Sequence, residues 1–219
     1  LGISSGDQSL RMDFIANAGD GSGVHQHDNM IIGPQLGERF SKGLTVECWL
    51  RPDTVQAIKR ILTQWHKGSW NLYDPKSFQL GATADDLPVC GLVSRTGVYL
   101  LTGNKRMAPG YWNHLAVVYD NNGQANNFKM LLNGEEIASA TATGDLLPST
   151  AMWVLGSTGT SHVSEGFVGE VDELRMWSVG KTGEEIRSGR FAHFSGTEPG
   201  LEAYFDFDSI SPFGEVADK

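Results

Sequence analysis

The feature that most constrains this chain is a repeated alternation of apolar and polar residues in short blocks. In the segment Leu44–Asp53, every second residue from Leu44 to Leu50 is apolar, whereas Trp49 and Arg51 fall on the opposite side. Successive side chains of a β-strand point to opposite faces, so a period of two predicts a strand with one buried face. The blocks are bounded by Gly, Asn, Asp or Pro, which favour turns.

Eleven further segments also suit strands, and more than ten strands in one domain require two stacked sheets. A tight hairpin is expected at Asn133-Gly134, because both turn positions need positive φ. The expected strands are Ile58–Trp65, Trp70–Tyr73, Ser77–Leu80, Val89–Ser94, Gly97–Thr102, Trp112–Tyr119, Phe128–Leu132, Glu136–Ser139, Ala151–Leu155, Phe167–Trp177 and Leu201–Phe207.

Helix signals are nearly absent from the chain. Thr182 precedes Glu185 by three residues, which is the capping-box spacing that satisfies the first free backbone N–H groups of a helix. We therefore expect one short helix from Gly183 to about Arg190. The predicted fold class is all-β: a two-sheet antiparallel sandwich with one short C-terminal helix.

Length and charge narrow the classes of protein further. A chain of 219 residues with 40% apolar and 20% charged residues fits one globular domain spanning residues 1–219. Its 17 basic and 26 acidic residues give a net charge of −9, and nucleic-acid binding needs clustered Lys and Arg. The longest apolar runs fall far short of the roughly 20 residues that span a bilayer. We expect neither nucleic-acid binding nor membrane insertion.

Five segments that occur in a fixed order carry a family resemblance. They are LTVECWLRPD from Leu44, WNHLAVVYD from Trp112, LLNGEEI from Leu131, WVLGS from Trp153 and GEVDELRMW from Gly169. Together they resemble the laminin-G-like jelly-roll modules of the concanavalin A-like lectin and glucanase group, with a core from about residue 9 to 190. The resemblance implies two face-to-face antiparallel sheets of about six or seven strands each.

The last part of the chain, residues 191–219, allows two interpretations. Thr197–Asp208 resembles the segment that opens the next module in tandem arrays of this family, but it can equally close the present module as an edge strand. In either case the chain resembles one module of a larger protein. Modules of this family usually belong to secreted or cell-surface proteins, so the resemblance implies an extracellular or cell-surface location.

The resemblance raises the question of enzyme activity, because laminarinase-type glycosidases share this fold. Those enzymes carry three carboxylates at alternate positions of one strand. Here Glu170 and Asp172 share a face, but the next position on it is Leu174. We therefore expect no glycoside hydrolase activity, and no Gly-x-Ser-x-Gly nucleophile elbow is present.

Asp172 is the carboxylate that most needs a partner. Strict alternation places it on the face of Leu174 and Met176, with Glu173 and Arg175 on the other, and an unpaired buried carboxylate costs several kcal/mol. Backbone N–H donors or a divalent cation would satisfy it, and both remain open. The resemblance implies a structural calcium at Asp172, with further oxygens from the N-terminal stretch: Asp13, Asp28 and Asn29.

The richest candidate binding cluster combines aromatic planes, which cover the apolar face of a sugar, with polar groups that bond its hydroxyls. It consists of Trp65, His66, Trp70, Asn71, Tyr73 and Asp74. Two functions remain: a noncatalytic glycan-binding module, calcium-stabilised and part of a larger extracellular protein, or a protein-protein adhesion or spacer module without sugar binding. The sequence leaves open the oligomeric state and a disulfide between Cys48 and Cys90.

Overall fold

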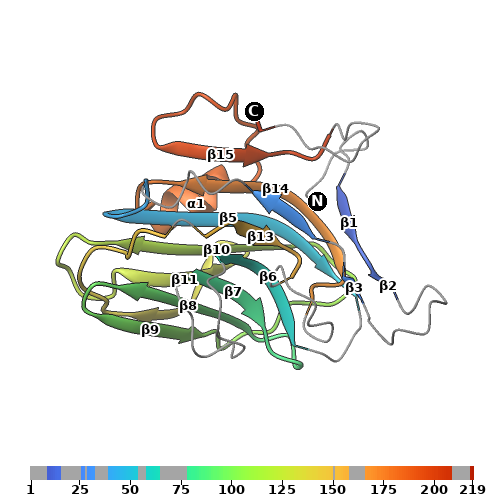
Figure 1. Cartoon of the computed structure of the whole chain (residues 1–219), viewed down its shortest axis with the longest axis horizontal. Helices are drawn as coiled ribbons and strands as arrows, with labels where there is room; N and C mark the ends of the chain where they lie inside the picture. Colours follow the sequence, from blue (N-terminus) through green and yellow to red (C-terminus); the bar gives the residue numbers. More distant parts are fainter. Residues whose placement is uncertain are drawn as a thin grey trace.

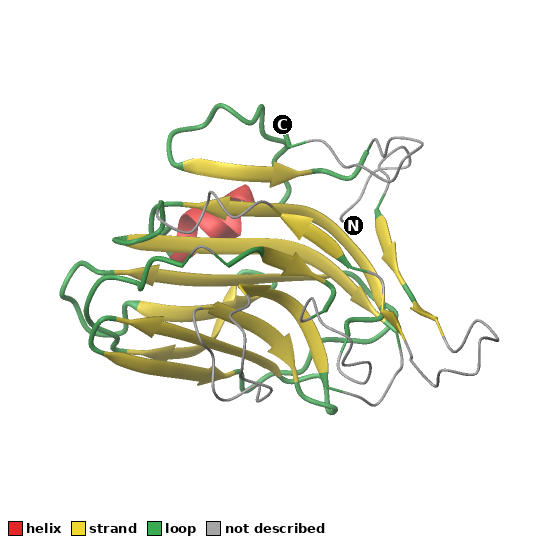
Figure 2. Ribbon diagram, viewed as in Figure 1, coloured by secondary structure: helices red, strands yellow, loops and turns green. Residues whose placement is uncertain are grey.

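The computed structural model describes residues 9–15, 26–27, 29–32, 39–53, 58–64, 78–149, 151–157, 166–208 and 218–219. Two curved antiparallel sheets are stacked face to face, and the one described helix lies outside the layers (Figures 1 and 2). This arrangement confirms the expected two-sheet sandwich.

The larger sheet has seven strands in the order β1-β14-β5-β10-β11-β12, with β15 also paired to β14. Its strands are β1 (Leu10–Met12), β5 (Gly43–Pro52), β10 (Asn113–Asp120), β11 (Phe128–Leu132), β12 (Glu135–Ala140), β14 (Gly169–Trp177) and β15 (Leu201–Phe205). The pair β15 and β14 brings the C-terminal part of the chain onto the edge of this sheet (Figure 1).

The smaller sheet has six strands in the order β4-β13-β6-β7-β8-β9. Its strands are β4 (Met30–Ile32), β6 (Lys59–Gln64), β7 (Phe78–Ala82), β8 (Pro88–Ser94), β9 (Gly97–Thr102) and β13 (Trp153–Leu155). A short pair, β2 (Phe14–Ile15) and β3 (Gln26–His27), lies beside the sandwich.

The core between the sheets is formed by the alternate residues that the sequence pattern assigned to it. Leu44, Val46, Cys48 and Leu50 of β5 are all buried in the main apolar cluster. Trp153 lies in the same cluster, between the rings of Phe40 and Phe78. Cys48 and Cys90 are both free and buried, and burial raises the pKa of each thiol.

Most strand predictions are confirmed to within two residues at each end. The expected strand Trp70–Tyr73 lies outside the described residues, and the sequence pattern missed the short strands β1 to β4. Strands of two or three residues offer no full period of alternation, so pattern analysis has little to detect in them.

The helix α1 (Gly183–Gly189) begins with the expected capping box. Glu185 N–H donates to the Thr182 side chain, and the Glu185 carboxylate accepts from Thr182 N–H at 2.7 Å. Ile186 is the buried residue of α1, and it packs against Ala116, Val118 and Leu131 on the outer face of the seven-stranded sheet. The amphipathic helix thus covers β10 and β11 from outside.

A β-bulge in β14 corrects the predicted orientation of Asp172. The register passes from Asp172 opposite Trp49 to Arg175 opposite Glu47, so three steps on β14 match two on β5. Glu173 is the extra residue and has φ of 52°. The prediction that Asp172 shares a face with Leu174 and Met176 was therefore wrong: Asp172 lies on the outer face with Trp49 and Arg175, because the bulge interrupts strict alternation.

Candidate functional site

The outer face of the seven-stranded sheet carries a connected group of polar and aromatic side chains. Three neighbouring strands, β14, β5 and β10, supply it. On β5, the residues alternating with the core residues point outward, including Glu47, Trp49 and Arg51. The register sets Glu47 opposite Ala116 on β10 and Trp49 opposite His114, so side chains far apart in sequence meet on this face.

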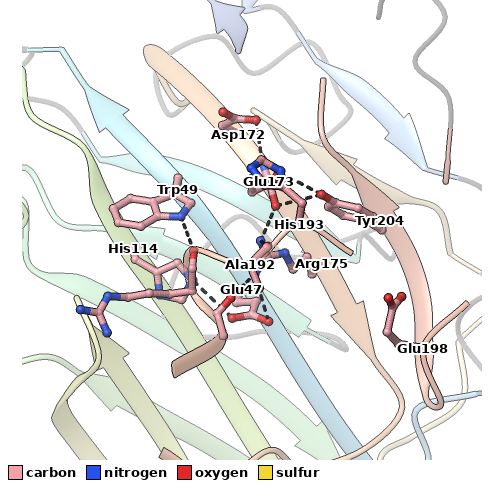
Figure 3. Close-up of polar contacts among 12 residues, drawn as sticks. Glu47, Trp49, His114, Asp172, Glu173, Arg175, Ala192, His193, Glu198 and Tyr204 are labelled. Carbon is pink, nitrogen blue, oxygen red and sulfur yellow. Dashed lines mark hydrogen bonds and ion pairs between the residues drawn. The ribbon is translucent and has the colours of Figure 1, made fainter. Parts of the chain in front are cut away.

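At the centre of this face lies the buried carboxylate of Glu47 (Figure 3). Trp177 donates its indole N–H to Glu47 Oε1 at 3.0 Å, and His114 Nε2 lies 3.3 Å from Glu47 Oε2. Arg175 lies at 3.8 Å. Burial disfavours the charged form of Glu47, but the His114 hydrogen bond, the charges of His114 and Arg175 and the Trp177 N–H outweigh burial and hold its pKa below the ordinary value.

A second carboxylate, that of Glu173, completes the network at the bulge. It is paired with the Arg175 guanidinium and accepts the hydroxyl of Tyr204 at 2.9 Å (Figure 3). His193 Nδ1 lies 3.4 Å from the same carboxylate at the surface. Positive φ is uncommon for a residue other than glycine, and here these contacts of the side chain hold Glu173 in place.

Residues 189–194, which start at the last residue of α1, cover this network, and we call them the strap. Arg175 donates to the backbone carbonyls of Gly189 at 3.2 Å and Ala192 at 2.5 Å, and Trp49 Nε1 donates to Arg190 O at 2.9 Å. The ring of Phe194 packs on the Arg175 guanidinium, whose central carbon lies 4.5 Å from the ring centroid. Glu47 is therefore enclosed beneath the strap, whereas Glu173 lies at its margin beside the exposed His193, and the network holds the strap on the sheet.

Beyond the strap the same face is open. Arg51 of β5 forms an ion pair with Glu170 of β14 at 2.5 Å, and its guanidinium lies 5.7 Å from the centre of the half-buried Trp112 ring. Arg11 of β1 lies opposite Glu170 and bonds Asp53. This row presents an aromatic ring beside ordered donors and acceptors.

The ligand-binding cluster predicted from the sequence lies outside the described residues. This holds for all six members: Trp65, His66, Trp70, Asn71, Tyr73 and Asp74. Their segment connects β6, which ends at Gln64, to β7, which begins at Phe78, and these two residues are paired in the six-stranded sheet. The cluster therefore belongs to a connection between two central strands of the smaller sheet and remains a prediction.

The residues proposed for calcium do not come together as one set of ligands. Asp172 is buried, and its Oδ1 accepts the N–H of Glu173 at 2.8 Å. Asp13 directly follows β1, whose register with β14 separates it from Asp172 by four strand positions, about 13 Å. Asp13 instead bonds Arg11 at 2.8 Å. Calcium ligands bind at about 2.3–2.6 Å, so these two aspartates cannot share an ion.

Of the two remaining calcium candidates, Asn29 is exposed and Asp28 lies outside the described residues. The described part of the chain holds no group of three or more His, Cys, Asp or Glu side chains arranged for a metal. Calcium binding itself stays a prediction.

The sequence analysis did not identify the strap network or the open row as sites. Trp49 and Arg51 were visible as outward residues of an alternating strand, which is the signal that could have found them. Their partners on β10 and β14 become neighbours through sheet pairing only, which a single sequence does not reveal.

Comparison with known families gives one clear result. The model of the concanavalin A-like lectin/glucanases superfamily matches residues 25–187, more than half of the chain. This match confirms the resemblance inferred from the ordered motifs. Among curated proteins, Pappalysin-1 from Mus musculus is 30% identical over 93 residues, a stretch that covers 42% of this chain and 6% of Pappalysin-1. The similarity therefore concerns a small part of that protein.

Three solved structures illustrate the fold. A candidate carbohydrate-binding protein from Bacteroides ovatus has a TM-score of 0.66 at 16% identity, over 97% of this chain and 55% of that one. The CBM40 domain of the Ruminococcus gnavus IT-sialidase, bound to α2,3-sialyllactose, has a TM-score of 0.56 at 17% identity, over 74% and 95%. Domain 4 of an extracellular arabinanase from Geobacillus stearothermophilus, in complex with arabinotriose, has a TM-score of 0.53 at 20% identity, over 83% and 81%. At these identities the similarity establishes the shared fold.

Proposed function

Because this chain belongs to the concanavalin A-like lectin/glucanases superfamily, we propose that it is a noncatalytic module that binds glycans. The observation that carries the proposal is the similarity of the fold to a candidate carbohydrate-binding protein over 97% of this chain, and to two domains with a bound oligosaccharide over 74% and 83% of it. Ligand sites on a shared fold differ from protein to protein, so the fold supports the ligand class and leaves the particular sugar open.

The proposed primary contact site is the segment between β6 and β7. Its Trp70 and Tyr73 supply the stacking planes, and Asn71 and Asp74 supply partners for sugar hydroxyls. What supports this assignment is composition together with position: the segment joins two central strands of the six-stranded sheet, and loops placed by a rigid scaffold commonly carry binding residues.

The noncatalytic part of the proposal rests on the arrangement of the described carboxylates. Retaining glycosidases need two carboxyl groups about 5–5.5 Å apart beside the sugar. Glu170 is paired with Arg51. Two further glutamates of this face, Glu47 and Glu173, bond buried partners beneath the strap. The pKa of Glu47 is held below its ordinary value, whereas a general acid at neutral pH needs a raised pKa.

The proposal also includes a secreted location and stabilisation by calcium. A secreted setting is supported by the extracellular arabinanase whose domain shares the fold. The described residues include no helix both long and apolar enough to cross a bilayer. Calcium stabilisation remains part of the proposal and is addressed by titration.

A glycan array probed with this chain tests the function. We expect binding to a defined subset of glycans, lost in both Trp70→Ala and Tyr73→Ala, with Val179→Ala as a control at an exposed apolar residue that follows β14 of the other sheet. A blank array with folded protein would favour the adhesion or spacer function instead. Release of reducing sugar from a β-glucan would contradict the noncatalytic assignment.

A further inference from the structure

The outer face of the seven-stranded sheet is divided into a roofed half and an open half. In the roofed half, Phe191 of the strap packs on Trp49, with ring centres 5.3 Å apart. Two residues further along β5, Arg51 is 41% exposed. We call the open half, formed by Arg51, Trp112 and Glu170, the outer shelf. Tyr111, beside Trp112 in sequence, is 72% exposed.

The shelf is ordered before any ligand arrives. Arg51 is held between the Glu170 carboxylate and the Trp112 ring, and Glu170 in turn lies opposite Arg11. Arg11 is itself fixed by two hydrogen bonds to Asp53, at 2.6 and 3.1 Å. Side chains restrained in this way lose little conformational freedom when they bind a ligand, which favours affinity.

The shelf offers the two kinds of contact that a sugar ring uses. The part of the half-buried Trp112 ring that the Arg51 guanidinium does not cover can stack on the apolar face of a pyranose, while a guanidinium and a carboxylate donate to and accept from its hydroxyls. Glu170 lies on β14, Arg51 on β5, and Trp112 directly precedes β10, so the shelf extends over three neighbouring strands, about 10 Å of sheet and about the length of a disaccharide. The surface is therefore large enough for more than one ring.

Charge selects the ligand class. On and beside the outer shelf, the charges of Arg11 and Arg51 are balanced by Glu170, Asp13 and Asp53. No net positive charge is therefore left there to attract an anion. The chain as a whole carries −9. A neutral polyhydroxyl ligand is therefore favoured over a sialylated or sulfated one.

From these observations we propose that the outer shelf is a second sugar-contact site, specific for neutral oligosaccharides, in which a sugar ring stacks on Trp112 and bonds Arg51 and Glu170. This inference rests on the proposed function but not on its site, because the proposed primary site joins β6 to β7, and these strands belong to the other sheet. Two contact sites on one module would raise avidity for long glycan chains.

Indole signals in a ¹H–¹⁵N NMR spectrum test the shelf directly, because the chain holds six tryptophans and each gives one signal. Trp112→Phe assigns the shelf signal by its loss, and Trp65→Phe and Trp70→Phe assign the signals of the other site. The probes are maltotriose, cellotriose and arabinotriose, with sialyllactose as the anionic comparison. We expect at least one neutral trisaccharide to shift the Trp112 signal, and sialyllactose to leave it in place.

The variants separate a contact role from a structural one. Because the Trp112 variants lack the shelf signal, their affinity is measured by calorimetric titration: Trp112→Ala should weaken shelf binding about tenfold and Trp112→Phe should retain most of it. Glu170→Gln should weaken binding while the remaining indole signals keep their positions. Shifts confined to Trp65 or Trp70 would overturn the shelf and leave the proposed function standing. A Trp112 shift with sialyllactose alone would overturn the neutral-ligand assignment, and no indole shift with any probe would overturn the shelf proposal.

Discussion

Removal of the Arg175 guanidinium should destabilise the fold strongly, because it is the shared partner of two enclosed carboxylates. In Arg175→Met a side chain of similar length replaces it, and Glu47 and Glu173 keep their charges while only 3% and 10% of their side chains are exposed. Breaking a buried ion pair on one side costs about 3–5 kcal/mol, since a charge is left without compensation. Arg175→Met also removes the hydrogen bonds to Gly189 and Ala192. Because they belong to the same network as the ion pairs, their energy is not added to the figure of about 3–5 kcal/mol.

We expect the free energy of unfolding to fall by about 4 kcal/mol. For a chain of this size that corresponds to a Tm about 8–16 °C lower. Urea denaturation followed by circular dichroism and by tryptophan fluorescence measures the change. Arg175→Met combined with Glu173→Gln should recover part of the loss, because one of the two stranded charges is removed. A loss below about 1 kcal/mol would refute the reasoning, since it would mean that water already solvates the network.

The loss of stability in Arg175→Met should also depend on pH. The pKa of Glu47 is lowered in the folded protein, so its ionised form contributes stability above the unfolded pKa of about 4.3, and that contribution is lost as pH falls below it. Without Arg175 one cause of the lowering disappears. The stability difference between wild type and Arg175→Met should therefore be largest near pH 7 and narrow below about pH 4. A difference that stays constant across this range would contradict the electrostatic explanation.

Four further outcomes are expected. Gly169→Ala should cost about 2–3 kcal/mol in urea denaturation, because Gly169 has φ of 146° and an added Cβ would lie 2.4 Å from Arg51 O; no loss would show that β14 can shift. Thr182→Ala should cost about 1 kcal/mol by removing the capping box of α1, measured in the same assay. Cys48 and Cys90 should react with a thiol reagent only on unfolding, since burial raises both pKa values; reaction in native buffer would contradict their enclosure. Calcium should raise the Tm of wild type but not of Asp172→Asn. A calorimetric titration in which calcium releases no heat, or a Tm that a chelator leaves unchanged, would refute the calcium prediction.

The sequence was most informative wherever alternation ran for five residues or more. The core side of β5 and the capping box of α1 could both be read from local pattern, because burial of one strand face and the free N–H groups of a helix start are local requirements. Asp172 could not be oriented in the same way. Its side depends on the bulge at Glu173, which strict alternation along β14 does not foresee.

The network on the outer face could not be predicted from the sequence, for a different reason. Glu47 and Trp177 are hydrogen-bonded although 130 positions apart in the chain, and only the pairing of β5 with β14 brings them together. The cluster around Trp70 presents the reverse case, since its composition suggested a site while its placement lies outside the described residues.

The most direct test of a glycan-binding, noncatalytic module is to follow a bound ligand over time. The chain is immobilised, loaded with an oligosaccharide that it bound on the array, and incubated for a day. The sugar is then eluted and its mass is measured by mass spectrometry. The account predicts that the sugar is retained and leaves with its mass unchanged. Shortened products, or folded protein that retains no glycan at all, would contradict it.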